Sequence, residues 1–186
     1  MGVIHERLVA CSVVIAMLLF APLAEAGGGS ADLPRALGVF KLRMTVDEFA
    51  RVARVTPQRC TDCANSELYA SLNAAQVRQL MPDLRDNAGM DFFFFENRLY
   101  HIGLGVESSD LAAVRKEYSA LYGSGQTYHL KNATSYIKWE DGGTLVTANY
   151  QTANEQVFAL NYFDWDIKAE RDFRVSVAAG QTSARQ

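Results

Sequence analysis

Two cysteines that lie three positions apart are the side chains of this sequence best suited to chemistry. Cys60 and Cys63 form a C-x-x-C pair, a spacing found in disulfides, thiol–disulfide oxidoreductases and some metal sites. A redox thiol usually lies at the start of a helix, whereas this pair follows Pro57 and precedes no helix-start signal. We therefore predict a structural loop disulfide between Cys60 and Cys63, with thiol–disulfide exchange as the alternative.

The histidines and acidic residues form no complete catalytic or metal-binding pattern. His101 falls in a predicted strand without a recognisable nucleophile, and neither it nor His129 has zinc-site spacing from the cysteines. Residues 164–166 read Asp-Trp-Asp but lack the central Gly and late Glu of a calcium-binding loop. No nucleotide-binding loop or nucleophile elbow occurs. The sequence predicts no catalytic residue, no metal ion and no cofactor.

Aromatic side chains are concentrated in the predicted strands. Most of them are expected in a hydrophobic core, but an antiparallel sheet often leaves one face exposed to water. Rings on such a face would form a binding surface, because Tyr and Trp are typical anchors at protein interfaces. The alternative is that all of these rings belong to the core. The candidate binding surface comprises Phe93, Phe95, Tyr100, Trp139, Tyr150, Tyr162 and Trp165.

The first 26 residues have the pattern of a cleavable signal peptide. Arg7 precedes an apolar run over residues 13–21, and residues 24–26 read Ala-Glu-Ala, which suits a signal peptidase. Cys11 lies at the start of the apolar run rather than at its end, so we expect no lipid attachment there. The sequence therefore predicts a periplasmic or secreted protein that begins at Gly27.

Charge and length limit the partners and the domain organisation that we expect. The chain of 186 residues has a formal net charge of −3 and no block of Lys or Arg, so nucleic acid is not an expected partner. After signal removal, no apolar stretch is long enough to span a membrane. We predict a flexible lead-in over residues 27–36, a single domain over 37–168, and a charged then polar tail over 169–186 that is disordered at its end.

Sequence patterns predict six strands and two well-marked helices. Thr45 and Glu48 form a capping box for a helix that ends before Pro57, after a short strand at residues 39–44. Residues 58–88 are difficult to interpret, although Asn73 could cap a helix. Next come a hairpin (90–95 and 99–106), a helix capped by Ser109 and ended by Gly123, and strands at 135–139, 144–150 and 156–163. This order predicts an α+β fold with an antiparallel sheet of about four to six strands and two or three helices on one face.

Three short segments resemble small bacterial envelope domains. The segments are residues 40–48 (FKLRMTVDE), 121–123 (LYG) and 139–142 (WEDG). The group includes the small lipoprotein of the outer-membrane β-barrel assembly machine and the β-lactamase-inhibitor-like fold. Arg43 stands where the opening signature of these domains usually has Gly. The resemblance implies helices packed on an antiparallel sheet and non-catalytic protein binding.

These observations favour an exported, non-catalytic domain that binds a protein or another envelope component through an aromatic-rich sheet. One alternative is a C-x-x-C thiol–disulfide oxidoreductase or chaperone that uses Cys60 and Cys63. Another is a small-ligand binder with an apolar cavity between the sheet and its helices.

Overall fold

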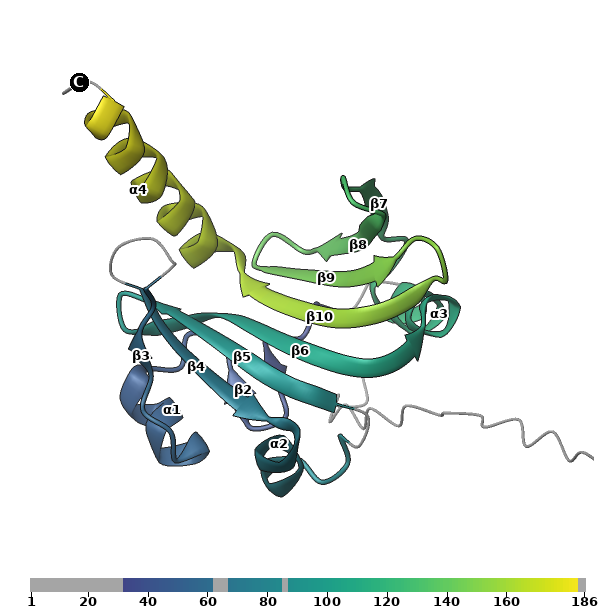
Figure 1. The fold of residues 1–186 in the computed structure, drawn as a ribbon, viewed down its shortest axis with the longest axis horizontal. Helices are drawn as coiled ribbons and strands as arrows, with labels where there is room; N and C mark the ends of the chain where they lie inside the picture. Colours follow the sequence, from purple (N-terminus) through teal and green to yellow (C-terminus); the bar gives the residue numbers. More distant parts are fainter. Residues whose placement is uncertain (1–31, 62–66, 85–86, 184–186) are drawn as a thin grey trace, which may run out of the picture.

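An eight-stranded antiparallel sheet organises the protein (Figure 1). The computed structural model describes residues 32–61, 67–84 and 87–183. The strand order is β3-β4-β5-β6-β10-β9-β8-β7. From one edge to the other, these strands are β3 (Gln58–Arg59), β4 (Glu67–Asn73), β5 (Asn87–Phe95), β6 (Arg98–Asp110), β10 (Gln156–Asp164), β9 (Thr144–Gln151), β8 (Thr134–Glu140) and β7 (Gln126–His129). A separate two-strand hairpin joins β1 (Ala36–Leu37) and β2 (Phe40–Lys41).

The predicted α+β class with an antiparallel sheet is confirmed, but the sheet is wider than the predicted four to six strands. The additional strands are β3, β4 and β7. β3 has two exposed residues and β7 is a fully exposed edge strand of four, so neither shows the alternation of a half-buried strand. The predicted 90–106 hairpin and the three later strands are confirmed as β5, β6, β8, β9 and β10.

Three helices cover one face of the sheet, which we call the inner face. α1 (Val46–Ala53) begins with the predicted capping box of Thr45 and Glu48. α2 (Ala74–Leu80) has a second capping box, formed by Asn73 and Gln76. α3 (Leu111–Tyr122) is capped by Asp110 rather than by the predicted Ser109, and it ends at Gly123, whose φ of 78° favours glycine.

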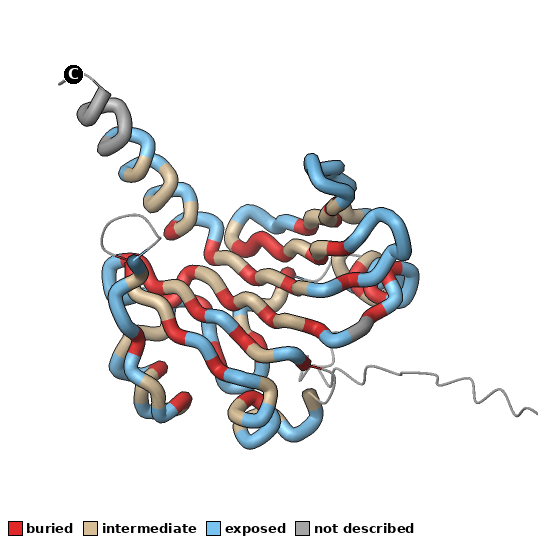
Figure 2. The backbone as a smooth tube through the Cα atoms, viewed as in Figure 1, coloured by how far each residue is buried: buried red, intermediate tan, exposed pale blue. Residues whose placement is uncertain are grey.

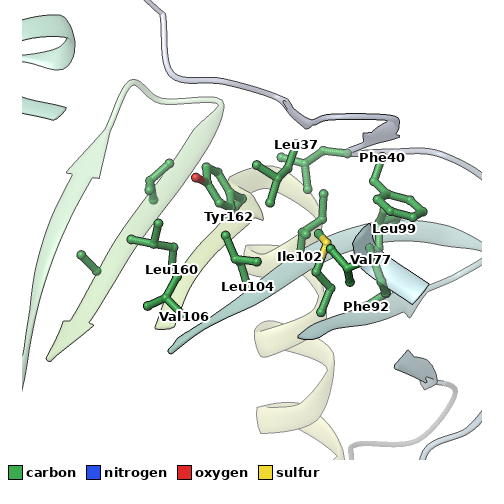
Figure 3. Packing of buried hydrophobic residues seen from close by; sticks show 14 of the residues in the cluster. Leu37, Phe40, Val77, Phe92, Leu99, Ile102, Leu104, Val106, Leu160 and Tyr162 are labelled. Atoms are coloured by element: carbon green, nitrogen blue, oxygen red, sulfur yellow. The ribbon is translucent and has the colours of Figure 1, made fainter. Parts of the chain in front are cut away.

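Packed rings fill the space between this face and the helices. Phe49 of α1 lies 4.7 Å from Phe92 and 5.1 Å from Phe94, measured between ring centroids, and Phe40 lies 4.5 Å from Phe92. All four rings are fully buried. Figure 3 shows Phe40 and Phe92 with aliphatic residues of β6 and β10, so one continuous core joins both halves of the sheet.

Strand alternation divides the run of four phenylalanines in β5 between the two faces, and a β-bulge lies opposite them in β6. Phe93 pairs with His101 and Phe94 pairs with Leu99, so Tyr100 is the extra residue. Phe92 and Phe94 point to the inner face, whereas Phe95 and Tyr100 form a small separate cluster with Ile167.

A fourth helix, α4 (Trp165–Ser183), follows β10 directly and projects away from the sheet (Figure 1). The sequence predicts a polar tail from residue 169, and the helix corrects this over the described residues. Its apolar residues are few: Ile167 is buried, whereas Phe173 is 68% exposed. Ion pairs supplement these few apolar contacts and attach α4 to the sheet, since Arg171 pairs with the buried Glu67 of β4.

The N-terminal lead-in is partly ordered. Leu33 is buried in the core, and its N–H donates to Asp141 Oδ2 over 2.7 Å, so residues 32–36 do not form the predicted flexible segment. The predicted signal peptide and Cys63 lie outside the described residues. Within those residues, no helix is both long and apolar enough to cross a membrane.

Candidate functional site

The sheet face opposite α1, α2 and α3, which we call the outer face, has no helix layer comparable to the inner one. α4 approaches it at two places: Ile167 packs against Phe95 and Tyr100 while Arg171 pairs with Glu67, and Trp165 and Lys168 lie beside β8, β9 and β10. Along the central strands, buried residues alternate with more accessible ones (Figure 2). The outer face is therefore where a partner or ligand could meet the sheet.

A row of stacked rings crosses four strands of the outer face. Tyr69, Phe93, His101 and Phe163 occupy paired positions on β4, β5, β6 and β10. Ring centroids are 5.0 Å apart for Tyr69 and Phe93, 5.0 Å for Phe93 and His101, and 4.2 Å for His101 and Phe163. The last two pairs are nearly parallel, at 10° and 18°, so these rings contact one another through their faces.

Polar side chains form the adjacent row. His101 Nε2 lies 3.0 Å from Asn161 Oδ1, and Asn161 Nδ2 donates to Thr147 Oγ1 over 3.3 Å. A Cβ atom at Gly103 would lie 3.4 Å from Asn161 Oδ1 and 3.6 Å from His101 Nε2. Glycine therefore keeps this position open beside the His101–Asn161 contact.

His101 is held neutral at physiological pH. Burial between two rings lowers its pKa to about 4, although the contact with Asn161 acts in the opposite direction. The Asp91 carboxylate also acts to raise the pKa of His101, but among the described residues His101 Nε2 is hydrogen-bonded to Asn161 and to no carboxylate. His101 therefore orders the outer face through its ring contacts and its contact with Asn161.

A groove of about 510 Å³ lies on the outer face beside the ring row. Strands β8, β9 and β10 form its floor, and α4 forms one side. Trp165 and Phe163 line one wall, and Tyr128 and Tyr136 line another. The two tyrosine rings stack at 5.0 Å with an angle of 11°.

The structure places the sequence-predicted binding residues on both sides of the sheet. Trp139, Tyr150 and Tyr162 are buried on the inner face, where Tyr162 OH lies 2.5 Å from Tyr118 OH. Phe95 and Tyr100 are also buried, in the cluster with Ile167. These five residues are corrected from surface to core, because strand alternation turns them towards helices. Phe93 and Trp165 do lie on the outer face.

Other residues of the outer face were not predicted as binding residues. They are Tyr69, His101, Tyr128, Tyr136 and Phe163. In a regular strand, the two neighbours of an inner residue point to the opposite face, so Ile137 places Tyr136 and Lys138 outside. The bulges in β6 and β10 break this counting, and the sequence does not mark them.

Among the described residues, the polar groups around His129 do not form a second candidate site. His129 Nδ1 lies 3.0 Å from Ser135 Oγ, and Ser135 Oγ lies 3.3 Å from Thr152 Oγ1, with no acidic residue in the chain of contacts. Among the described residues, no group of three or more His, Cys, Asp or Glu side chains could hold a metal ion. Pairing of Cys60 with Cys63 stays a prediction, because Cys63 is not described.

Comparison with known proteins gives no family. No known family model matches the chain, and no curated protein is similar to it. A crystal structure of a cysteine-rich secretory protein from Staphylococcus aureus subsp. aureus Mu50 resembles it with a TM-score of 0.42 and 5% identity over 67% of this chain. The chain spans 44% of the length of that protein. Function is therefore inferred from the residues of this chain alone.

Proposed function

We propose that this chain is an exported, non-catalytic domain that binds a protein or another envelope component through the outer face of its sheet. Export rests on the signal-peptide pattern of residues 1–26, and the periplasm or the cell exterior is the proposed location. A disulfide between Cys60 and Cys63 would suit that location.

The asymmetry of the two sheet faces carries the proposal. Three helices and a continuous core cover the inner face, whereas the outer face presents accessible rings, amides and lysines around a groove. Trp165 is 38% exposed and Tyr128 is 36% exposed. Large aromatic side chains at an uncovered concave surface are typical of binding sites.

The polar chemistry of this face also favours binding over catalysis. His101, its only histidine among the described residues, is neutral and donates to an amide rather than to a carboxylate. Thr147 accepts from Asn161, and no histidine or carboxylate among the described residues is hydrogen-bonded to its hydroxyl. The groove therefore offers contacts to a ligand without an activated nucleophile.

A pair of matched substitutions tests the proposal. Thr147→Tyr fills the groove floor with a residue that favours strands, and Thr127→Tyr makes the same change on β7, where Thr127 pairs with Ile137 of the inner face. The mature protein should co-sediment with a native envelope fraction, Thr147→Tyr should lose that binding, and Thr127→Tyr should keep it. Equal binding by both variants would contradict a role for the groove.

A further inference from the structure

The floor of the groove is polar and uncharged. Thr147, Asn149 and Asn161 lie on the outer face of β9 and β10 and line it. Each of these side chains carries both a hydrogen-bond donor and an acceptor. Within the part of the chain that the structure describes, the Asn149 amide has no side-chain hydrogen bond, so it is available to a ligand.

The backbone beneath this floor is already paired. β8, β9 and β10 are interior strands of the sheet, and their N–H and C=O groups bond to neighbouring strands. A ligand in the groove can therefore use only side chains for hydrogen bonds. An extended peptide normally obtains its affinity from main-chain hydrogen bonds at a sheet edge, which this position does not provide.

The walls present rings to the groove. One face of Phe163 is covered by His101, and its strand neighbour on the other side is Leu145, which also lines the groove. Trp165 stands at the start of α4, and Tyr128 lies at the opposite edge of the groove. Walls of this kind suit the C–H faces of sugar rings, whose hydroxyl groups would meet the amides and hydroxyl of the floor.

Both charged side chains that line the groove are lysines. Lys138 pairs with Glu140 at 3.1 Å and Lys168 pairs with Asp172 at 2.5 Å, but neither acidic residue lines the groove. Exposed ion pairs of this kind contribute little to stability, so each ammonium group can bind a ligand anion instead. The groove is therefore complementary to a ligand that carries negative charge.

We infer, on the basis of the proposed function, that the groove binds a short stretch of an oligosaccharide bearing carboxylate groups. Sugar hydroxyls would bond to Thr147, Asn149 and Asn161, and carboxylates would pair with Lys138 and Lys168. Trp165 and Tyr128 would pack against the sugar rings. A groove of about 510 Å³ lies within the usual size range of small-ligand sites.

Titration of the mature protein with a hexamer of galacturonic acid tests this inference. We expect saturable binding, with a dissociation constant between about 10 µM and 1 mM. Cellohexaose, a neutral hexamer, should bind at least about tenfold more weakly, and hexaglutamate should not bind measurably. Equal affinity for hexaglutamate would show that charge alone is recognised, and it would overturn the inference, as would no binding of the acidic hexamer.

Variants locate the binding. Trp165→Ala should weaken binding of the acidic hexamer at least about tenfold, and the nearly isosteric Asn149→Asp should do the same by placing a negative charge in the floor. Phe173→Ala, which changes an exposed ring of α4 outside the groove, should leave binding unchanged. Unchanged binding by folded Asn149→Asp would overturn the inference. Should the hexamer fail to bind while Thr147→Tyr still abolishes envelope binding, the ligand class alone would be wrong.

Discussion

Arg43 Nε lies 2.6 Å from Oδ2 of the buried Asp164. This contact joins the segment before α1 to the junction between β10 and α4. Arg43 also pairs with Asp166 at 2.6 Å, and its φ of 69° is in the left-handed region that favours glycine. The ion pairs offset the strained backbone of Arg43.

We predict that Arg43→Gly destabilises the protein, although glycine relieves the backbone. Losing the pair with Asp164 should cost more than the roughly 1 kcal/mol that the relaxed backbone returns. Arg35 still pairs with Asp164, so a net loss of about 2 kcal/mol in the free energy of unfolding is expected from urea denaturation.

Arg54→Gly is a matched control for this prediction. Arg54 ends α1 with φ of 55°, and it has no ion pair within the described residues. Glycine there should stabilise the protein by about 0.5–1 kcal/mol. If both substitutions stabilised it equally, the Arg43–Asp164 contact would have no net effect.

Arg171→Met should remove the main attachment of α4. The substitution leaves the Glu67 carboxylate buried without its cation, which typically costs about 3 kcal/mol in unfolding free energy. Combining it with Glu67→Leu removes the unpaired charge and should recover most of that loss. A double variant as unstable as Arg171→Met alone, measured by urea denaturation, would argue against this account.

Stability should fall as pH decreases from about 6.5 to 4. In the unfolded chain a histidine takes up its proton near pH 6.5, but burial between two rings lowers the pKa of His101 to about 4. The unfolded state therefore binds more protons in this window, and His101 should account for a loss of about 3 kcal/mol by pH 4. His101→Gln should remove that part of the pH dependence. Parallel pH profiles of the two proteins would show that His101 does not titrate in this way.

Cys60 and Cys63 should be bridged and inert in the exported protein. Mass spectrometry of unreduced mature protein should show two hydrogens fewer than the reduced form, and thiol reagents should not label it. Rapid exchange of the pair with glutathione at neutral pH would instead support the alternative of a thiol–disulfide oxidoreductase.

Local signals predicted most of the elements. The Thr45–Glu48 capping box and the polar turn between β5 and β6 are short-range patterns, and both occur in the structure as expected. By contrast, α4 depends on distant partners such as Glu67, which no local pattern reveals. A segment with few apolar residues resembles a polar tail until those partners are known.

The outer face could be predicted only in part. The aromatic richness of the strands indicated a binding surface, but which rings face outward depends on register and on bulges. The extra residue Tyr100 in β6 turns His101 to the side of Phe93, and the shift near Phe158 sets the face of Phe163. The groove also needs the first turn of α4, which the sequence did not predict as a helix.

Site-specific photo-crosslinking in intact cells of the native host tests the central claim most directly. Benzoylphenylalanine at position 136 would lie in the groove wall, and the same residue at position 116 would lie on α3, across the sheet. The proposed function predicts adducts with an envelope component from position 136 and none from position 116. Adducts from position 116 alone would contradict binding through the outer face.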